Sequence, residues 1–391
     1  MRRFPNIFCI PLSLCAWSAS ATLSHGLDQA TNSVSEQLRL EAHGFVSFGY
    51  FRTWENNYLA ADSMDGSTDF YEAAMNASIR PWDRVRIGAQ LYLRDLGRYE
   101  NGEPRLDWAF AEYTADEAAV FQFGRVKVPG GLYNDLQDID PARTSVFLPQ
   151  SIYPIRLRDS QVAVDGGKFT GFFDKLFGNG VSYAIYGGTK NIDSDSAFAQ
   201  STAERSFGIA TDVDVDAFFG GMLHWNTPID ELGLRVSGNR TENITVISKT
   251  NFGQATQTTD VDIVVLSAEW QSAHWTFANE YAYSRNKGVT NSPVMPNVER
   301  NYHGGYINAT WHATKWLDAY GAIEYQYSDT NGTSTDGWAY VAAINIMPLS
   351  NWSIKAEFQF HDGPIGISKA DNPQGVSTTW EMLALKTTVD F

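Results

Sequence analysis

Residues 380–391 read WEMLALKTTVDF, and their side chains alternate between two kinds. One set is mostly apolar and consists of Leu383, Leu385, Thr387, Val389 and Phe391. Successive side chains of a β-strand point to opposite faces, so this stretch predicts a strand with one apolar face and one mostly polar face. Such a strand occurs at the edge of a soluble sheet as well as in a membrane barrel, so the rest of the chain has to decide between them.

The same alternation recurs far away in the chain. It is clearest in RVRIGAQLYLR (84–94), and it returns in WLDAYGAIEYQYS (316–328) and NWSIKAEFQFH (351–361). In each stretch charged side chains stand on the second face. A packed sandwich core would disfavour charges there, whereas a water-filled lumen would accept them.

The connections between these stretches come in two lengths. The short ones are residues 80–83, 114–118, 226–231, 271–274, 312–315 and 348–350, and the long ones are 55–67, 95–105, 129–158, 189–215, 287–300 and 362–377. Short turns at one end and long loops at the other are typical of outer-membrane barrels. A first count gives an odd number of strands, so we interpret residues 204–212 as part of one acidic loop, 189–215. The prediction is then an all-β fold, a 16-stranded antiparallel transmembrane β-barrel.

The first residues have the features of an export signal. Arg2 and Arg3 precede an apolar run that ends at Ala19-Ser20-Ala21, the small-residue pattern of a cleavage site. We therefore expect residues 1–21 to be a signal peptide, 22–42 a periplasmic N-terminal segment and 43–391 a single barrel domain. A membrane anchor and a lipoprotein modified at Cys15 are the alternatives, although the run is short for a membrane span.

Composition limits the possible partners. The formal net charge is −16, which disfavours nucleic acid. Aromatic residues make up 14% of the chain, as expected where aromatic girdles meet two membrane interfaces. Both cysteines, Cys9 and Cys15, lie in the predicted signal peptide, so we expect no disulfide in the mature protein.

One stretch carries a family resemblance. Residues 124–160, GRVKVPGGLYNDLQDIDPARTSVFLPQSIYPIRLRDS, look like the third-loop region of Gram-negative porins, and 124–132 is similar to the phosphate-selective and dicarboxylate porin relatives. The final strand, LALKTTVDF (383–391), resembles the assembly signal of outer-membrane proteins. The resemblance implies a homotrimer in the outer membrane of a Gram-negative bacterium. No dense run of arginine or lysine accompanies it, which argues against a phosphate-selective pore.

The third loop is long and partly apolar. Residues 129–158 contain four prolines, and VFLPQSIYPI (146–155) is too apolar to lie in water. We predict that this loop folds into the barrel and narrows the pore. An apolar loop that covers a neighbouring subunit or lies at the membrane surface is the alternative.

Charged residues on one strand and in this loop are the candidate site. If the apolar face meets lipid, the arginines of the 84–94 stretch face the lumen, because a charge toward lipid costs roughly 2–4 kcal/mol near the midplane. Opposite charges across a constriction select ions. The alternative is that these charges pair with each other and only hold the loop. The predicted constriction and lumen residues are Arg84, Arg86, Arg94, Asp135, Asp138, Asp140, Arg143, Arg156 and Arg158.

No motif for chemistry accompanies the barrel pattern. The seven histidines are scattered, without helical metal-ligand spacing, and no nucleophile or nucleotide motif occurs. We therefore expect no enzyme activity, no metal and no cofactor. The expected function is that of a porin in contact with outer-membrane lipid, which passes small hydrophilic solutes, organic anions among them. The alternatives are a barrel hydrolase, in which His224 or His303 would assist a serine, and a gated, ligand-specific channel.

Overall fold

The computed structural model describes residues 39–391, apart from residues 61, 98, 252, 292–295, 365 and 368–370. The predicted signal peptide and most of the predicted N-terminal segment lie outside the described residues. The first strand begins at Glu41, two residues before the expected start of the barrel at 43.

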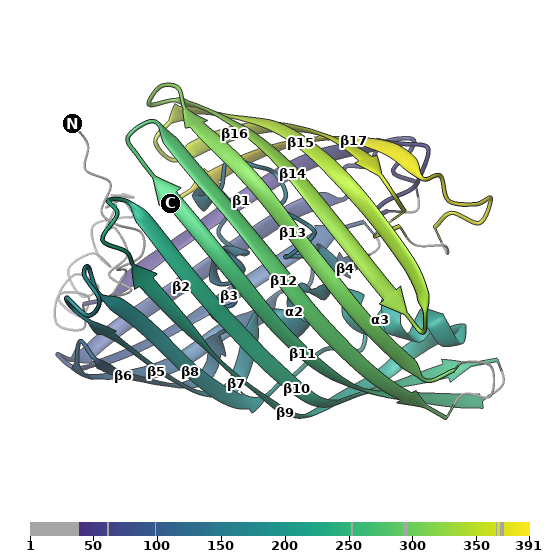
Figure 1. The fold of residues 1–391 in the computed structure, drawn as a ribbon, viewed down its shortest axis with the longest axis horizontal. Coiled ribbons are helices and arrows are strands. Elements are labelled where there is room, and N and C mark those ends of the chain that lie inside the picture. Colours follow the sequence, from purple (N-terminus) through teal and green to yellow (C-terminus); the bar gives the residue numbers. More distant parts are fainter. Residues whose placement is uncertain are drawn as a thin grey trace, which may run out of the picture.

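The strands form one closed antiparallel sheet (Figure 1). The first strand, β1 (Glu41–Trp54), pairs with β2 (Phe70–Trp82) on one side and with the last strand, β17 (Thr379–Asp390), on the other. A three-residue strand, β4 (Tyr99–Asn101), pairs only with β3 (Val85–Leu96) inside a loop and adds nothing to the wall. The wall therefore has 16 strands, which confirms the predicted fold class.

The remaining strands follow in chain order around the ring. They are β5 (Arg105–Asp116), β6 (Ala119–Lys127), β7 (Ala163–Phe173), β8 (Val181–Thr189), β9 (Gly208–Asn226), β10 (Leu232–Thr250), β11 (Gly253–Gln271), β12 (Trp275–Thr290), β13 (Val298–His312), β14 (Leu317–Thr330), β15 (Thr333–Leu349) and β16 (Trp352–Asp362). Short helices occupy the connections: η2 (Asn134–Leu136), η3 (Asp140–Ala142), η4 (Ile155–Leu157), α2 (Arg158–Gln161), α3 (Ala197–Ala203) and η5 (Glu204–Ser206).

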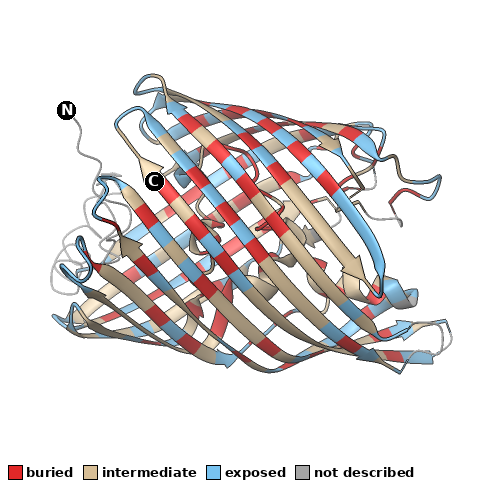
Figure 2. Cartoon of the chain, viewed as in Figure 1, coloured by how far each residue is buried: buried red, intermediate tan, exposed pale blue. Residues whose placement is uncertain are grey.

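The two faces of the wall differ as the alternation predicts. On β3, Ile87 and Leu91 are 44% and 54% exposed. Between them, Gln90 is 4% exposed, and Arg86 before them is 3% exposed. The same banding runs along the other strands (Figure 2). The apolar side chains thus point outward and the polar ones inward, which is the arrangement that a surrounding apolar solvent requires.

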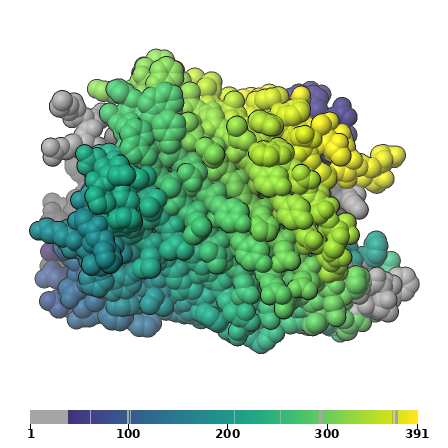
Figure 3. Space-filling view, in the orientation of Figure 1, coloured from purple at the N-terminus to yellow at the C-terminus, as the bar shows by residue number. Residues whose placement is uncertain are grey.

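The outer face of the wall, which Figure 3 shows in space-filling view, carries many exposed apolar side chains. Its exposed side chains include Phe48, Ile87, Leu91, Phe123, Ile185, Leu223, Leu266, Ile307, Ile323, Ile344 and Leu385. Several exposed tryptophans lie near the short turns, among them Trp82, Trp275, Trp311 and Trp316. In a soluble monomer an apolar surface of this extent would drive aggregation. Among the described residues, no helix is both long and apolar enough to cross a bilayer.

The predicted acidic loop 189–215 is wrong in its second half. Strand β9 begins at Gly208, which pairs with Thr250 of β10, so residues 208–215 continue the ladder. Only the first half of that range is a loop, and it contains α3 and η5. The ladder persists because its backbone hydrogen bonds do not require an apolar face, and the side chains of Asp212 and Asp214 are exposed.

Candidate functional site

Residues 128–162, between β6 and β7, form the third loop, and they are fastened to the inward faces of strands across the ring. The backbone N–H of Gly131 donates to Ser237 Oγ of β10 at 2.8 Å, and that of Leu132 donates to Glu280 Oε1 of β12 at 2.7 Å. Arg235 Nη1 donates to the Gly131 carbonyl at 2.6 Å. This end of the loop therefore reaches β10 and β12, several strands away from β6 in the ring.

Buried carboxylates on the wall accept further backbone N–H groups of the third loop. Glu357 of β16 accepts from Val146 at 2.7 Å, and Glu324 of β14 accepts from Ser151 at 2.9 Å. Both carboxylates lie on the inward faces of their strands. A buried N–H without a partner costs about 1–3 kcal/mol, so these carboxylates help to hold the loop backbone inside the ring.

The strongest attachment is made by Asp140 in η3. Its carboxylate lies 3.0 Å from Lys355 Nζ and 2.8 Å from Lys386 Nζ, and it accepts from Thr388 Oγ1 at 2.6 Å. Burial alone would raise the pKa of Asp140, but the two lysines and Arg143 outweigh burial and hold this pKa well below its usual range. Asp140 is therefore a buried anion that joins the loop to β16 and β17.

The other edge of the third loop is tied to nearby strands. Arg158 Nη2 lies 2.6 Å from Asp107 Oδ1 of β5, and its guanidinium carbon is 4.3 Å from the centre of the Tyr92 ring. Asp138 pairs with Lys127 at the end of β6 and accepts from Gln90 of β3. These ion pairs and the contacts of Asp140 attach the loop on two sides of the interior.

The apolar part of the loop is packed against the wall. Phe147 stacks on Phe70 of β2 with ring centres 5.4 Å apart. Ile152 and Tyr153 lie in a second apolar cluster with Val265 of β11. The stretch that is too apolar for water is thus buried against inward side chains of β2 and β11.

The predicted site residues fall into three groups: one lies in a turn, two lie on a strand and are paired, and the others lie in the third loop. Arg84 is exposed in the turn before β3, at the short-turn rim, because the strand begins only at Val85. Arg86 and Arg94 point inward, but each is paired with a carboxylate, Glu112 and Glu100 respectively.

The loop residues of the prediction also differ from one another. Asp138, Asp140, Arg143 and Arg158 are engaged in ion pairs, whereas Asp135 is half-buried and its backbone carbonyl accepts from Lys127. Arg156 of η4 has no carboxylate partner among the described residues. The paired groups hold the loop, and Arg156 retains an uncompensated charge.

Several residues that hold the third loop were not predicted from the sequence. Lys355 and Lys386, the buried partners of Asp140, lie on the polar faces of their strands. The two-residue alternation of their strands places both lysines on the inner face, so the sequence did contain a signal for them.

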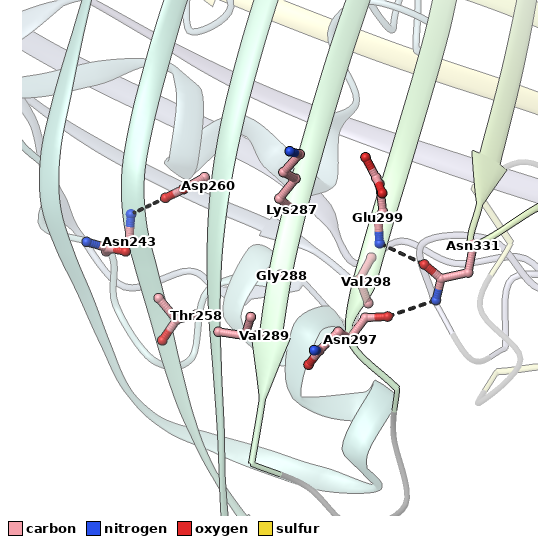
Figure 4. Close-up of a pocket in the computed structure, with 10 residues that line it drawn as sticks. All are labelled: Asn243, Thr258, Asp260, Lys287, Gly288, Val289, Asn297, Val298, Glu299 and Asn331. Atoms are coloured by element: carbon pink, nitrogen blue, oxygen red, sulfur yellow. Dashed lines mark hydrogen bonds between the residues drawn. The ribbon is translucent and has the colours of Figure 1, made fainter.

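Two cavities lined by described residues lie in different parts of the barrel. One of about 350 Å³ lies inside the ring between the third loop and β3–β7, and Arg94, Arg105, Asp107 and Arg158 line it with others. A second, of about 460 Å³, lies at the ends of β10–β13, with Asp260, Lys287 and Glu299 among its lining residues (Figure 4). By strand alternation these three side chains lie on the outward face, so the second cavity is not part of the interior.

One histidine takes part in a relay of polar groups. His312 Nδ1 lies 3.0 Å from Asp318 Oδ1, and His312 Nε2 lies 3.1 Å from Thr276 Oγ1. All three residues stand at the short-turn ends of their strands. His303 lies against Tyr281, with its Nδ1 2.7 Å from the tyrosine oxygen, and His224 Nε2 lies 3.0 Å from Asn226 Oδ1. The described part of the chain contains no group of three side chains placed to hold a metal ion.

No family model and no curated protein sequence matches this chain. Solved structures do share its fold. An OmpT variant from Vibrio cholerae, an outer membrane protein, is 10% identical, with a TM-score of 0.58 over 90% of this chain and 99% of that one. The same protein is also known in a trimer form.

Two further solved structures are similar over a comparable length. The anion-selective porin of Comamonas acidovorans is 10% identical, with a TM-score of 0.56 over 90% of this chain and 99% of that one. OmpF of Salmonella typhi, in complex with daunomycin, is 14% identical, with a TM-score of 0.58 over 91% of this chain and 99% of that one. At these identities the likeness concerns the fold.

Proposed function

We propose that this protein is a porin of a Gram-negative outer membrane, a passive diffusion channel for small hydrophilic solutes. The observation that carries the proposal is the third loop, which ion pairs and carboxylates hold on the inner side of a barrel with an apolar exterior. A loop held there narrows the interior of the barrel and leaves the strand pairing of the wall unchanged. Similarity to a barrel described as an anion-selective porin supports the same function.

Organic anions are the solutes that we expect to be favoured. The acidic loop residues Asp138 and Asp140 are neutralised by lysines, so they add little free negative charge. Arg156 keeps its charge without a carboxylate partner among the described residues. The charges within about a Debye length, ~8 Å at physiological salt, set the field at a constriction, and the acidic net charge of the whole chain does not. The chain has no dense run of arginine or lysine, which argues against phosphate as the solute.

We further propose that the protein is a homotrimer in contact with outer-membrane lipid. Its outward face is apolar, and one barrel of the same fold is described in a trimer form. Crosslinking in intact outer membranes tests this. A trimer band is expected, and a monomer at every crosslinker concentration contradicts it.

Reversal potentials in a salt gradient test the proposed function. Purified protein in a planar bilayer is expected to carry current with a mild preference for chloride over potassium. The R156Q variant is expected to shift the reversal potential toward cations, because it removes a positive charge without a described carboxylate partner from the third loop itself. Cation selectivity of the wild type, or an unchanged potential in R156Q, would contradict the anion preference.

A hydrolase is the second candidate, favoured by a single observation. The hydroxyl, imidazole and carboxylate of Thr276, His312 and Asp318 follow the order of a nucleophilic triad. Hydrolysis of p-nitrophenyl acetate by the purified barrel, abolished in both T276A and H312A, would support this candidate. Hydrolysis that is equal in the wild type and both variants would exclude this triad as its source.

A further inference from the structure

Two aromatic rings lie on the inward face of β5, where the alternation of the wall predicts polar side chains. Trp108 and Phe110 stack on each other, with ring centres 5.3 Å apart and an angle of 25° between the ring planes. Strand pairing sets Trp108 opposite Gln90 and Phe110 opposite Gly88 of β3. Paired residues share a face of the sheet, and Gln90 is an inward residue, so both rings face the interior of the barrel.

The wall leaves room for the Trp108 ring at Gly88. A Cβ atom added to this glycine would lie 3.1 Å from the Trp108 ring and 3.3 Å from Cβ of Ser78 on β2. The indole therefore reaches across β3 toward β2, over a position that has no side chain of its own.

The polar groups beside the rings are more deeply buried than the rings. Arg86 and Gln122 are each 3% exposed, whereas Trp108 and Phe110 are only half-buried. The Arg86 guanidinium carbon lies 4.9 Å from the centre of the Phe110 ring, and Arg86 Nη2 lies 2.9 Å from Glu112 Oε2. The rings therefore contribute more of the surface toward the lumen than the basic and amide side chains that lie next to them.

The third loop covers this apolar surface only in part. Phe110 packs against an apolar cluster that includes Val128, at the start of the loop. Asp107, which precedes Trp108, pairs with Arg158 at the end of the loop. From there β5 continues toward the short turns, so the rings lie on the short-turn side of this attachment. Apolar surface in contact with water is unfavourable, and a ligand that covers it removes this cost.

Hydrogen-bonding groups with spare capacity lie beside the rings. The Glu112 carboxylate accepts three hydrogen bonds, two from Arg86 and one from Gln122, whereas a carboxylate can accept about four. Asn76 is half-buried and donates to Gln90 Oε1 at 3.3 Å, and its side-chain amide has a second N–H. Because Arg86 and Glu112 neutralise each other, this part of the wall favours a neutral polar ligand over an ion.

A sugar ring combines the two properties that this part of the wall can recognise. One face of a β-glucoside ring carries axial C–H bonds, which the negative face of an aromatic ring attracts. The rim of the sugar carries hydroxyl groups, which both donate and accept hydrogen bonds.

We propose that Trp108 and Phe110 form a stacking site for a neutral pyranose sugar, a hexose or a hexose glycoside, with Glu112 and Asn76 as partners of its hydroxyl groups. This inference rests on the proposed function and names a class of solute that the interior binds. A sugar that enters from the long-loop side reaches the site after it passes the third loop.

Saturation-transfer NMR tests the site without any measurement of current. The sample is the purified barrel in a detergent without a sugar headgroup, and the probe is methyl β-glucoside. Saturation is expected to pass most strongly to the axial hydrogens of one ring face. Mannitol, which has hydroxyl groups but no ring, is expected to receive roughly fivefold less saturation. W108L/F110L keeps apolar side chains without aromatic rings and should lower the glucoside signal to a similar extent.

A second pair of rings on the outer face provides a matched control. Trp275 and Phe277 of β12 have the same spacing in sequence and stack with ring centres 5.6 Å apart, but both are exposed on the outward face. W275L/F277L is therefore expected to keep the wild-type signal. W108F retains an aromatic ring and is expected to keep part of it.

Current recording connects the site with the channel. Methyl β-glucoside is expected to interrupt the wild-type chloride current more often than mannitol at the same concentration, and less often in W108L/F110L. If this double variant lacks the heat-dependent gel shift of a folded barrel, W108L and F110L are each expected to weaken both signals.

The outcomes separate this site from the proposed function. A folded wild-type barrel without chloride current overturns the channel, while saturation transfer still decides whether the sugar site exists. Equal transfer to methyl β-glucoside and mannitol, or equal transfer in wild type and W108L/F110L, overturns the sugar site and leaves the channel standing.

Discussion

Replacement of Asp140 by asparagine should release the third loop from the far wall while the barrel stays folded. Lys355 and Lys386 are fully buried and share this carboxylate. Removal of one partner of a buried ion pair costs roughly 3–5 kcal/mol. Lys386 keeps Glu72 as a second partner, so the lower end, about 3 kcal/mol, applies. That shifts the equilibrium between attached and released loop by roughly a hundredfold, since 1.4 kcal/mol is a factor of ten.

The loop and the barrel can be followed separately. Trypsin cleavage after Arg143 reports a released loop, and the shift between unheated and heated protein on a gel reports a folded barrel. D140N should be cleaved faster than the wild type and show larger, noisier single-channel currents. The control D135N removes the same charge from a half-buried position outside this ion-pair cluster. Equal cleavage and equal currents in D140N, D135N and wild type would refute the assignment of Asp140 as the main attachment.

Three further substitutions test the wall and its closure. I307R places a charge on the outward face within β13 and should lower the free energy of unfolding in urea by roughly 2–4 kcal/mol. L349R, at the end of its strand, should lower it by only about 0–1 kcal/mol. Equal losses in the two variants would contradict a lipid-facing band. F391K should lower the fraction of protein assembled in the outer membrane far more than D390K, because Phe391 points outward where the last strand meets β1; equal fractionation argues against this role. E357A leaves two buried loop N–H groups without their acceptor, at about 1–3 kcal/mol each, so hydrogen exchange in the third loop should accelerate; unchanged exchange speaks against the contact.

Acid should break the attachment of the loop through Asp140 only at low pH. Asp140 has a pKa held well below its usual value in the folded protein, so its contribution to loop attachment is complete above its unfolded pKa, near 4. That contribution is lost as pH falls through the lower folded pKa. Trypsin is inactive at such low pH, so cleavage of the released loop by pepsin is the measurement. Release between pH 5 and 7 would contradict this sign.

The wall was predictable because two solvents act on every strand. Lipid outside and polar contacts inside impose a two-residue alternation on each strand. This alternation can be recognised in the sequence at Arg86, Ile87 and Leu91, even when the residues that their side chains contact are unknown. The first and last residues of the strands were harder to predict from the sequence. Arg84 continues the alternation in sequence but lies in a turn, and residues 208–215 extend a strand although their acidic composition suggests a loop.

The attachment of the third loop could not be derived in the same way. The partners of Asp140 are more than two hundred residues away in sequence, and closure of the barrel brings them together. A sequence shows which face a side chain takes, but its partner across the interior depends on the strand order and register of the closed sheet.

Single-channel recording of the purified wild-type protein tests the central claim most directly. A barrel with a polar interior that the third loop narrows should produce discrete, stable current steps in a planar bilayer, and these steps should become larger in D140N. A wild-type protein that is folded by its heat-dependent gel shift, yet adds no current above that of the protein-free bilayer, would contradict the account.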